Sequence, residues 1–190
     1  MSRLPYPSLD DLPQEAAAAL AAFPTPINIV RMTGHAPSLL APLLNLSIAV
    51  MTSLALTDRH REMLLLLTAH ETGCQYEWTQ HLPQAAAAGL SPGDIALIRD
   101  STRQSPDPAE RALLSTGRRY LTAGETSHLV QVLQAHFTDE EIVEILYLLG
   151  YMRMFCLVVN ALDLEVDPAG ITIANGFAQL RDAQAAGRRQ

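Results

Sequence analysis

The sequence predicts an all-α fold, a single-domain bundle of about eight helices. Nearly half of the 190 residues are hydrophobic (48%) but only 5% are aromatic. Alanine and leucine supply most of this hydrophobicity, and both are strong helix formers. No segment alternates polar and apolar residues for long enough to indicate a β-strand. A chain of this length can also bury one sizeable core.

The N-terminal part is interrupted by several prolines. Ser8 as N-cap, with Asp11 at the third helical position, predicts a first short helix over residues 8–23. Residues 24–34 are expected to form an irregular arm. Pro37 suits the first turn of a helix, so a second helix is expected to begin there.

Capping residues and glycines mark the ends of the next helices. Thr57 is a suitable N-cap for a helix that runs to about residue 70. The following helix begins near Cys74 and ends at Gly89, which can adopt the left-handed conformation. Ser91 caps a short helix that ends near residue 101.

Two capping boxes begin the longer helices of the C-terminal half. Residues 107–110 (Asp-Pro-Ala-Glu) open a helix that Gly124 is expected to end. Residues 138–141 (Thr-Asp-Glu-Glu) open the longest helix, which reaches about residue 162. A short helix over residues 127–137 lies between them, and a last helix is expected over residues 176–186.

Composition also indicates which binding partners and which cellular location to expect. The net charge is −7 and the sequence pI is about 5.3, without a basic cluster, so nucleic acid and anionic membrane surfaces are not expected partners. Residues 1–7 lack the apolar segment of a signal peptide. The most apolar stretches, residues 63–69 and 154–159, are far shorter than the roughly 20 residues that span a bilayer. Two cysteines are too few for a disulfide framework, and we expect a cytoplasmic protein.

Three reactive side chains share one face of the helix that follows Gly73. Cys74, Glu77 and His81 occupy positions i, i+3 and i+7. A carboxylate one turn from an imidazole fixes its tautomer and raises its proton affinity, as proton transfer near neutral pH requires. Cys74 lies at the helix N-terminus, where the helix dipole favours a thiolate. Glu62, on the preceding helix, is placed to fold back onto this face.

Simpler interpretations of these residues stay open. A Glu–His pair at i,i+4 is common on helix surfaces without any function. A lone cysteine is more often a small buried hydrophobic residue than a nucleophile. The three side chains could also hold a metal, but a recognised zinc motif such as His-Glu-x-x-His is absent, so no metal is expected.

Three segments together resemble a known family. They are residues 61–69 (Arg-Glu-Met-Leu-Leu-Leu-Leu-Thr-Ala), 73–81 (Gly-Cys-Gln-Tyr-Glu-Trp-Thr-Gln-His) and 87–95 (Ala-Ala-Gly-Leu-Ser-Pro-Gly-Asp-Ile). This pattern resembles the core of the carboxymuconolactone decarboxylase and alkylhydroperoxidase-D-like family, and residues 150–162 are similar to its last conserved helix.

The resemblance implies an alkylhydroperoxidase-D-like fold, one domain over residues 1–190 and a homotrimer or homohexamer. The domain would consist of an N-terminal arm with one helix (1–36), the family core (37–164) and a C-terminal extension (165–190). No metal or organic cofactor is implied.

Two chemistries occur in this family. The peroxidase branch has a glutamate, then after eleven residues Cys-x-x-Cys, then after three more a histidine. Glu62, Cys74 and His81 match this pattern, but Glu77 replaces the second cysteine, the thiol that attacks peroxide in that branch. Cys156 could in principle resolve a sulfenic acid on Cys74, yet nothing in the sequence places the two together. The decarboxylase branch carries Glu-x-x-x-His, which Glu77 and His81 reproduce.

We therefore predict a cofactor-independent lyase that acts on a small cyclic carboxylate or lactone. His81 is the predicted proton donor, Glu77 orients it, and Glu62 is a further partner or an alternative base. Two alternatives are a thiol-dependent peroxidase that uses Cys74 and a helical module that binds a ligand without catalysis.

The longest helix offers two supporting groups. Arg153 and Asn160, on one face of the longest helix, are candidates to bind the substrate. An ion pair or solvent exposure is the favoured explanation of Arg153, and a bond to a neighbouring helix is the alternative for Asn160. Tyr76 and Trp78 are expected to be core or subunit-contact residues.

Overall fold

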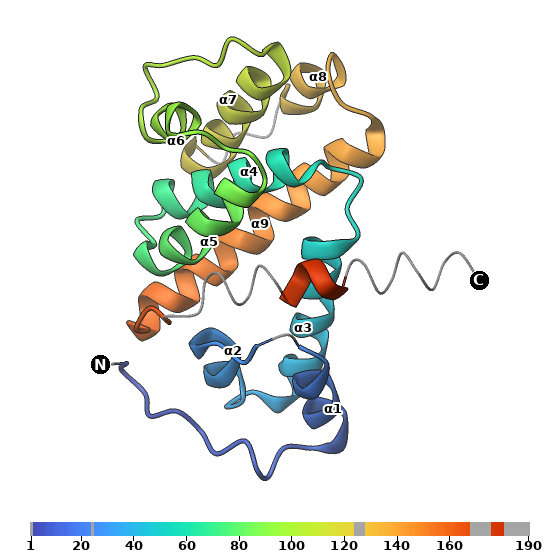
Figure 1. Cartoon of the computed structure of the whole chain (residues 1–190), viewed down its shortest axis with the longest axis vertical. Coiled ribbons are helices and arrows are strands. Elements are labelled where there is room, and N and C mark those ends of the chain that lie inside the picture. The colour runs from blue at the N-terminus through green and yellow to red at the C-terminus, as the bar shows by residue number, and fades with distance from the viewer. Residues whose placement is uncertain (1, 24, 124–127, 168–175, 181–190) are drawn as a thin grey trace, which may run out of the picture. The chain divides into compact units, whose positions relative to one another are not determined.

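The computed structural model describes residues 2–23, 25–123, 128–167 and 176–180. Within these ranges every regular element is a helix (Figure 1). The predicted all-α fold is therefore confirmed.

The chain divides into two compact units. One comprises Met1–Leu54 together with Leu162–Gln190, and the other comprises Ala55–Ala161. These boundaries differ from those expected for the N-terminal arm (1–36), the family core (37–164) and the C-terminal extension (165–190). The organisation as a single domain stays a prediction.

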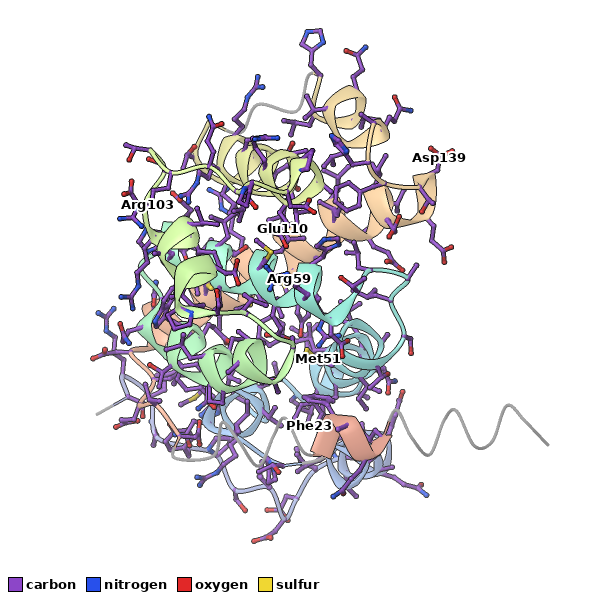
Figure 2. All side chains as sticks on the ribbon, turned by 45° about the horizontal axis from the view of Figure 1, so that its top comes forward. Phe23, Met51, Arg59, Arg103, Glu110 and Asp139 are labelled. Carbon is purple, nitrogen blue, oxygen red and sulfur yellow. The ribbon has the colours of Figure 1, made fainter. Side chains whose placement is uncertain are left out.

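In the first unit, the regular elements of the described residues are four helical segments. They are α1 (Gln14–Ala22), α2 (Asn28–Thr33), α3 (Pro37–Thr52) and a short helical segment at residues 176–180. Phe23, labelled in Figure 2, packs edge-to-face on Phe177 of that segment, with ring centroids 5.5 Å apart. The helix expected over residues 176–186 is thus present in its described part, and residues 181–186 lie outside the described residues.

The start of α1 differs from the prediction. Pro13, not Ser8, is the N-cap residue of α1. The Ser8 hydroxyl instead accepts the Asp10 N–H at 3.3 Å. A serine followed by acidic residues forms such local turns as readily as helix caps, and here the turn ends before Pro13.

The irregular arm expected over residues 24–34 is also a wrong prediction, because it contains α2. The Asn28 N–H at the start of α2 donates to both carboxylate oxygens of Asp167, at 3.0 and 3.1 Å. An acidic side chain at a helix N-terminus satisfies free N–H groups and complements the helix dipole. Pro37 lies in the first turn of α3 as predicted.

The second unit is built around α4. Its described helices are α4 (Asp58–Glu71), α5 (Gln75–Ala87), α6 (Pro92–Arg99), α7 (Pro108–Ala123), α8 (Leu129–Gln134) and α9 (Asp139–Leu162), which ends at the unit boundary. α4 contacts α5, α6 and α7 (Figure 1). All residues from Arg61 to Ala69 are buried, so this part of α4 is covered on every side and lies in the core of this unit.

Most predicted caps of this unit are confirmed. Thr57 Oγ1 accepts a backbone N–H at 3.1 Å at the start of α4. Ser91 and Asp94 form a capping box at the start of α6. Thr138 and Glu141 form another at the start of α9, with N···O distances of 2.9 and 3.3 Å. The end of α7 at Gly124 and the helix start at residue 127 lie outside the described residues.

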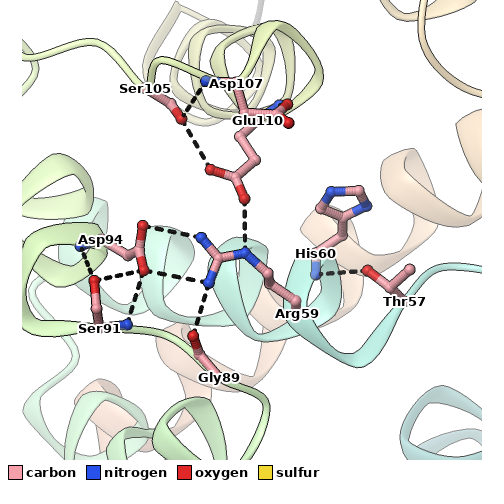
Figure 3. A network of polar contacts seen from close by, with 9 residues as sticks. All are labelled: Thr57, Arg59, His60, Gly89, Ser91, Asp94, Ser105, Asp107 and Glu110. Atoms are coloured by element: carbon pink, nitrogen blue, oxygen red, sulfur yellow. Dashed lines mark hydrogen bonds and ion pairs between the residues drawn. The ribbon is translucent and has the colours of Figure 1, made fainter.

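The capping box predicted over residues 107–110 forms only in part. Asp107 Oδ1 accepts the Glu110 N–H at 3.0 Å, but the Glu110 carboxylate turns to Arg59 Nε (2.7 Å) and Ser105 Oγ (2.9 Å). Arg59 also pairs with Asp94 at 2.9 Å (Figure 3). One guanidinium therefore joins α4 to both α6 and α7, and Figure 2 shows Arg59 and Glu110 close together in this unit.

α9 is long and apolar enough, by length and composition, to cross a membrane. Its uninterrupted apolar runs are short because polar residues lie between them, and the sequence therefore predicted no spanning segment here. The core helix of a folded domain can meet the same criterion. The buried side chains of α9 are Ile142, Ile145, Leu148, Leu149, Met152, Cys156 and Val159.

Candidate active site

The turn between α4 and α5 brings two helices side by side. Gly73 has a φ of +62°, in the left-handed region that glycine adopts without steric cost. The chain reverses there, Cys74 becomes the N-cap residue of α5, and α5 packs along α4. This packing places Glu62 of α4 next to His81 of α5.

Glu62 is fully buried, with 0% of its surface exposed, and its two oxygens have different partners. Oε2 accepts the Nδ1–H of His81 at 2.9 Å. Oε1 accepts from Nε and Nη2 of Arg61 at 3.2 and 3.1 Å, and Arg61 reaches Asp58 as well, at 2.6 Å. A buried carboxylate needs such charged donors to offset its lost hydration. Glu62 therefore fixes the imidazole with Nδ1 protonated and Nε2 directed away from α4.

Glu77 faces the second imidazole nitrogen. Its Oε2 lies 3.7 Å from Nε2 of His81, which is an ion-pair distance and too long for a hydrogen bond. The orienting hydrogen bond of His81 thus comes from Glu62 and not, as expected from the i,i+4 spacing, from Glu77. The 3.7 Å gap leaves Nε2 available to another proton acceptor.

The pKa values of Glu77 and His81 are both raised, but for different reasons. Burial raises the pKa of Glu77, and the opposite charge of His81 offsets only part of this rise. For His81, burial alone would lower the pKa, but the charge and hydrogen bond of Glu62, with the charge of Glu77, raise it above its usual value. Both side chains therefore retain a proton more readily than in water.

Cys74 lies on the same face of α5, one turn before Glu77. Cys74 is buried, with 1% of its surface exposed, and the Cys156 side chain on α9 lowers its pKa. Sequence reasoning could not place Cys156 here, because this proximity depends on how α9 packs beside the α4–α5 turn.

The two residues expected to bind substrate, Arg153 and Asn160, are both exposed on α9. Nδ2 of Asn160 donates to the carbonyl oxygen of Thr72 at 3.1 Å. The amide therefore holds α9 to the α4–α5 turn, and a role of Asn160 in substrate binding stays a prediction.

A small hollow opens at the first turn of α5, with a volume of about 150 Å³. Cys74, Trp78, His70 and Arg99 are among the residues that line it. Trp78 is buried, and the Arg99 guanidinium lies 4.7 Å from the centre of its ring, a cation–π contact. Sequence reasoning did not identify His70 and Arg99, because no local motif marks them and they become neighbours only through the packing of α4, α5 and α6.

The described residues contain no cluster of three His, Cys, Asp or Glu side chains arranged to bind a metal ion. What the site does contain is a buried acid–base chain in which Glu62 holds His81 and Glu77 faces it. Such an arrangement can take up, store and deliver one proton.

Known proteins share this sequence pattern and this fold. Residues 37–119 match the sequence profile of the carboxymuconolactone decarboxylase family. No curated protein matches the chain significantly.

Several solved structures have a similar fold. The AhpD core of an uncharacterised peroxidase-related protein from Ralstonia eutropha JMP134 has a TM-score of 0.74 and 19% identity, covering 91% of this chain and 96% of that one. A protein of unknown function from Agrobacterium tumefaciens, suggested to be the antioxidant defence protein AhpD, has a TM-score of 0.63 and 25% identity over 75% of this chain and 98% of that one. The debrominase Bmp8 in its apo form has a TM-score of 0.66 and 15% identity over 90% and 96% of the two chains. Residues 37–119 therefore match the carboxymuconolactone decarboxylase family, as the motifs indicated, and the fold is the all-α fold of AhpD-like proteins.

Proposed function

We propose that the protein is a cofactor-independent lyase of the carboxymuconolactone decarboxylase type, acting on a small cyclic carboxylate or lactone. The observation that carries the proposal is the buried chain of Glu62, His81 and Glu77. One imidazole nitrogen is bonded to Glu62 at 2.9 Å, and the other faces Glu77 at 3.7 Å.

His81 is the proton donor in this proposal. Decarboxylation breaks the bond between a ring carbon and the carboxylate, and the electron pair moves onto an adjacent carbonyl to form an enolate. A proton from Nε2 of His81 then adds to that carbon. Glu62 stabilises the imidazolium before the transfer, and the raised pKa of His81 keeps the proton available near neutral pH.

Glu77 is the second acid–base group in this proposal. Because burial raises its pKa, Glu77 can hold a proton and return it to His81 after the transfer, which leaves a Glu77 carboxylate beside the imidazolium it has formed. His81 and Glu77 are 8% and 6% exposed, so the reacting edge is sheltered from water but not sealed. A sheltered site favours the loss of a charged carboxylate as neutral carbon dioxide.

The test is carbon dioxide release from 4-carboxymuconolactone and a panel of related lactone acids. Replacing His81 with glutamine is expected to lower kcat by about 100-fold or more, the usual contribution of general acid catalysis. The matched control is His128→Gln, because His128 is exposed and should leave turnover unchanged. Absence of turnover across the panel, or a His81→Gln variant as active as wild type, would contradict the proposal.

A further inference from the structure

A groove runs along α6, between this helix and the second half of α5. Its volume is about 470 Å³, within the range of about 300–1,000 Å³ that small-molecule sites occupy. The apolar side chains that line it include Leu82 and Ala86 of α5, Leu90 of the connection and Ile95 of α6. His81 and its two carboxylate partners are not among the lining residues. The groove is therefore separate from the candidate active site.

The turn between α5 and α6 is held in place by Arg59 (Figure 3). Arg59 Nη1 donates to the carbonyl oxygen of Gly89 at 2.9 Å, and Nη2 pairs with Asp94 of α6 at 2.9 Å. Gly89 has a φ of +84°, in the left-handed region, and the capping box of Ser91 and Asp94 follows directly. The two helices therefore leave this turn in a fixed direction, and the groove is formed before any ligand binds, which lowers the cost of binding.

Arg99 provides a positive charge at one end of the groove. It is the last residue of α6 and is exposed, and its guanidinium carbon lies 4.7 Å from the centre of the Trp78 ring. Stacking on a ring restricts the arginine side chain but leaves the donors at the rim of its planar guanidinium accessible. Among the described residues no ion pair occupies Arg99, and the adjacent carboxylate of Asp100 bonds Thr102 and Arg103 instead. The guanidinium can therefore form a paired hydrogen bond with a ligand carboxylate.

The opposite end of the groove does not favour a second anionic group. Pro92 lines this end and has no backbone N–H to donate. The Asp94 carboxylate already lies at this helix N-terminus, where it accepts the Ser91 N–H at 2.8 Å. A helix rises about 1.5 Å per residue, so Pro92 and Arg99 lie about 10 Å apart along the axis of α6. This distance matches the length of a medium-chain acyl group.

We propose that the α5–α6 groove binds a free medium-chain aliphatic monocarboxylic acid, with its carboxylate on Arg99 and its acyl chain against Leu82, Ala86 and Ile95. A polar body is excluded, because burying its unpaired groups against these side chains costs free energy. A neutral chain of the same length would bury the same apolar surface but lose the paired hydrogen bond. The site does not rest on the lyase proposal, because it uses neither His81 nor the release of carbon dioxide.

The test titrates the full-length protein with octanoate. Trp78 is the only tryptophan of the chain and lies against Arg99, so a carboxylate that binds this guanidinium should change the tryptophan fluorescence in a saturable way. Octanol presents the chain without the charge, and acetate presents the charge without the chain. Each should bind at least about 10-fold more weakly than octanoate. Absence of a saturable change up to about 1 mM octanoate, or octanol that binds as tightly as octanoate, would overturn the proposal.

Two variants separate the charge from the groove, with calorimetry as the readout because the first alters the surroundings of Trp78. Arg99→Gln should weaken octanoate binding about 10-fold or more and leave octanol binding unchanged. Ala86→Leu places a larger side chain at an exposed position of the groove, so it should weaken the binding of both ligands without lowering the Tm.

The matched control is Arg103→Gln. Arg103 is exposed and pairs with Asp100 outside the groove, so this variant should bind octanoate as wild type does. Wild-type affinity for octanoate in Arg99→Gln would refute the role of Arg99, and wild-type affinity in Ala86→Leu would refute the groove as the binding site.

Discussion

Replacement of Glu62 by glutamine tests the centre of the candidate site. The substitution keeps the side-chain shape but removes the negative charge between Arg61 (3.1 and 3.2 Å) and His81 (2.9 Å). Glu62 is 0% exposed, so water does not replace the lost charge. Truncating one partner of a buried ion pair costs about 3–5 kcal/mol. Because an amide oxygen still accepts one hydrogen bond, we expect the lower end, about 3 kcal/mol.

This cost is measurable by thermal unfolding. At about 2–4 °C per kcal/mol for a chain of this size, the expected fall in Tm is roughly 6–12 °C. The pKa of His81, followed by NMR, should fall as well, because Glu62 is the main group that raises it against the effect of burial. The control is Glu140→Gln at an exposed position, with an expected change within about 0.5 kcal/mol. A Glu62→Gln protein with wild-type Tm and an unchanged His81 pKa would refute this account of the site.

Two further predictions concern pH and packing. The pKa of His81 is raised above its usual 6.5 in the folded protein, so the stabilising contribution of this residue is complete below about pH 6.5 and is lost as pH rises through the folded pKa. In urea unfolding, the difference in unfolding free energy between wild type and His81→Gln should therefore be smaller at pH 9 than at pH 5.5. A difference that grows with pH would contradict this prediction. Gly117→Ala should cost about 1–3 kcal/mol, because the new Cβ would lie 2.7 Å from Cδ2 of the buried Leu67, whereas Gly93→Ala, 3.4 Å from the Ser91 hydroxyl, should be neutral in the same urea titration.

The sequence predicts the elements of the second unit better than those of the first. The starts of α4 and α9 depend on Thr57 and on Thr138 with Glu141, which bond backbone groups within a few residues. Such caps are local, so sequence reveals them. α2 depends instead on Asp167, a partner 139 residues away, and no local pattern indicates that contact.

The same distinction applies to the candidate site. Helical spacing correctly places Cys74, Glu77 and His81 on one helix. The expectation that Glu62 of the preceding helix lies against this face is also correct. Which carboxylate bonds which imidazole nitrogen depends on the packing of α4 against α5, and the spacing favoured Glu77. The proximity of Cys156 to Cys74 depends on the packing of α9, and no local sequence pattern predicts it.

The charged groups of the site form a row of alternating sign: Asp58, Arg61, Glu62, His81 and Glu77. In such a row each ionisation state alters the field at the next member, so the last two groups titrate as one system with macroscopic constants. Both limbs of a bell-shaped pH–rate profile would then belong to the His81–Glu77 pair jointly. Substituting either residue should leave a single limb, displaced from both positions that wild type shows.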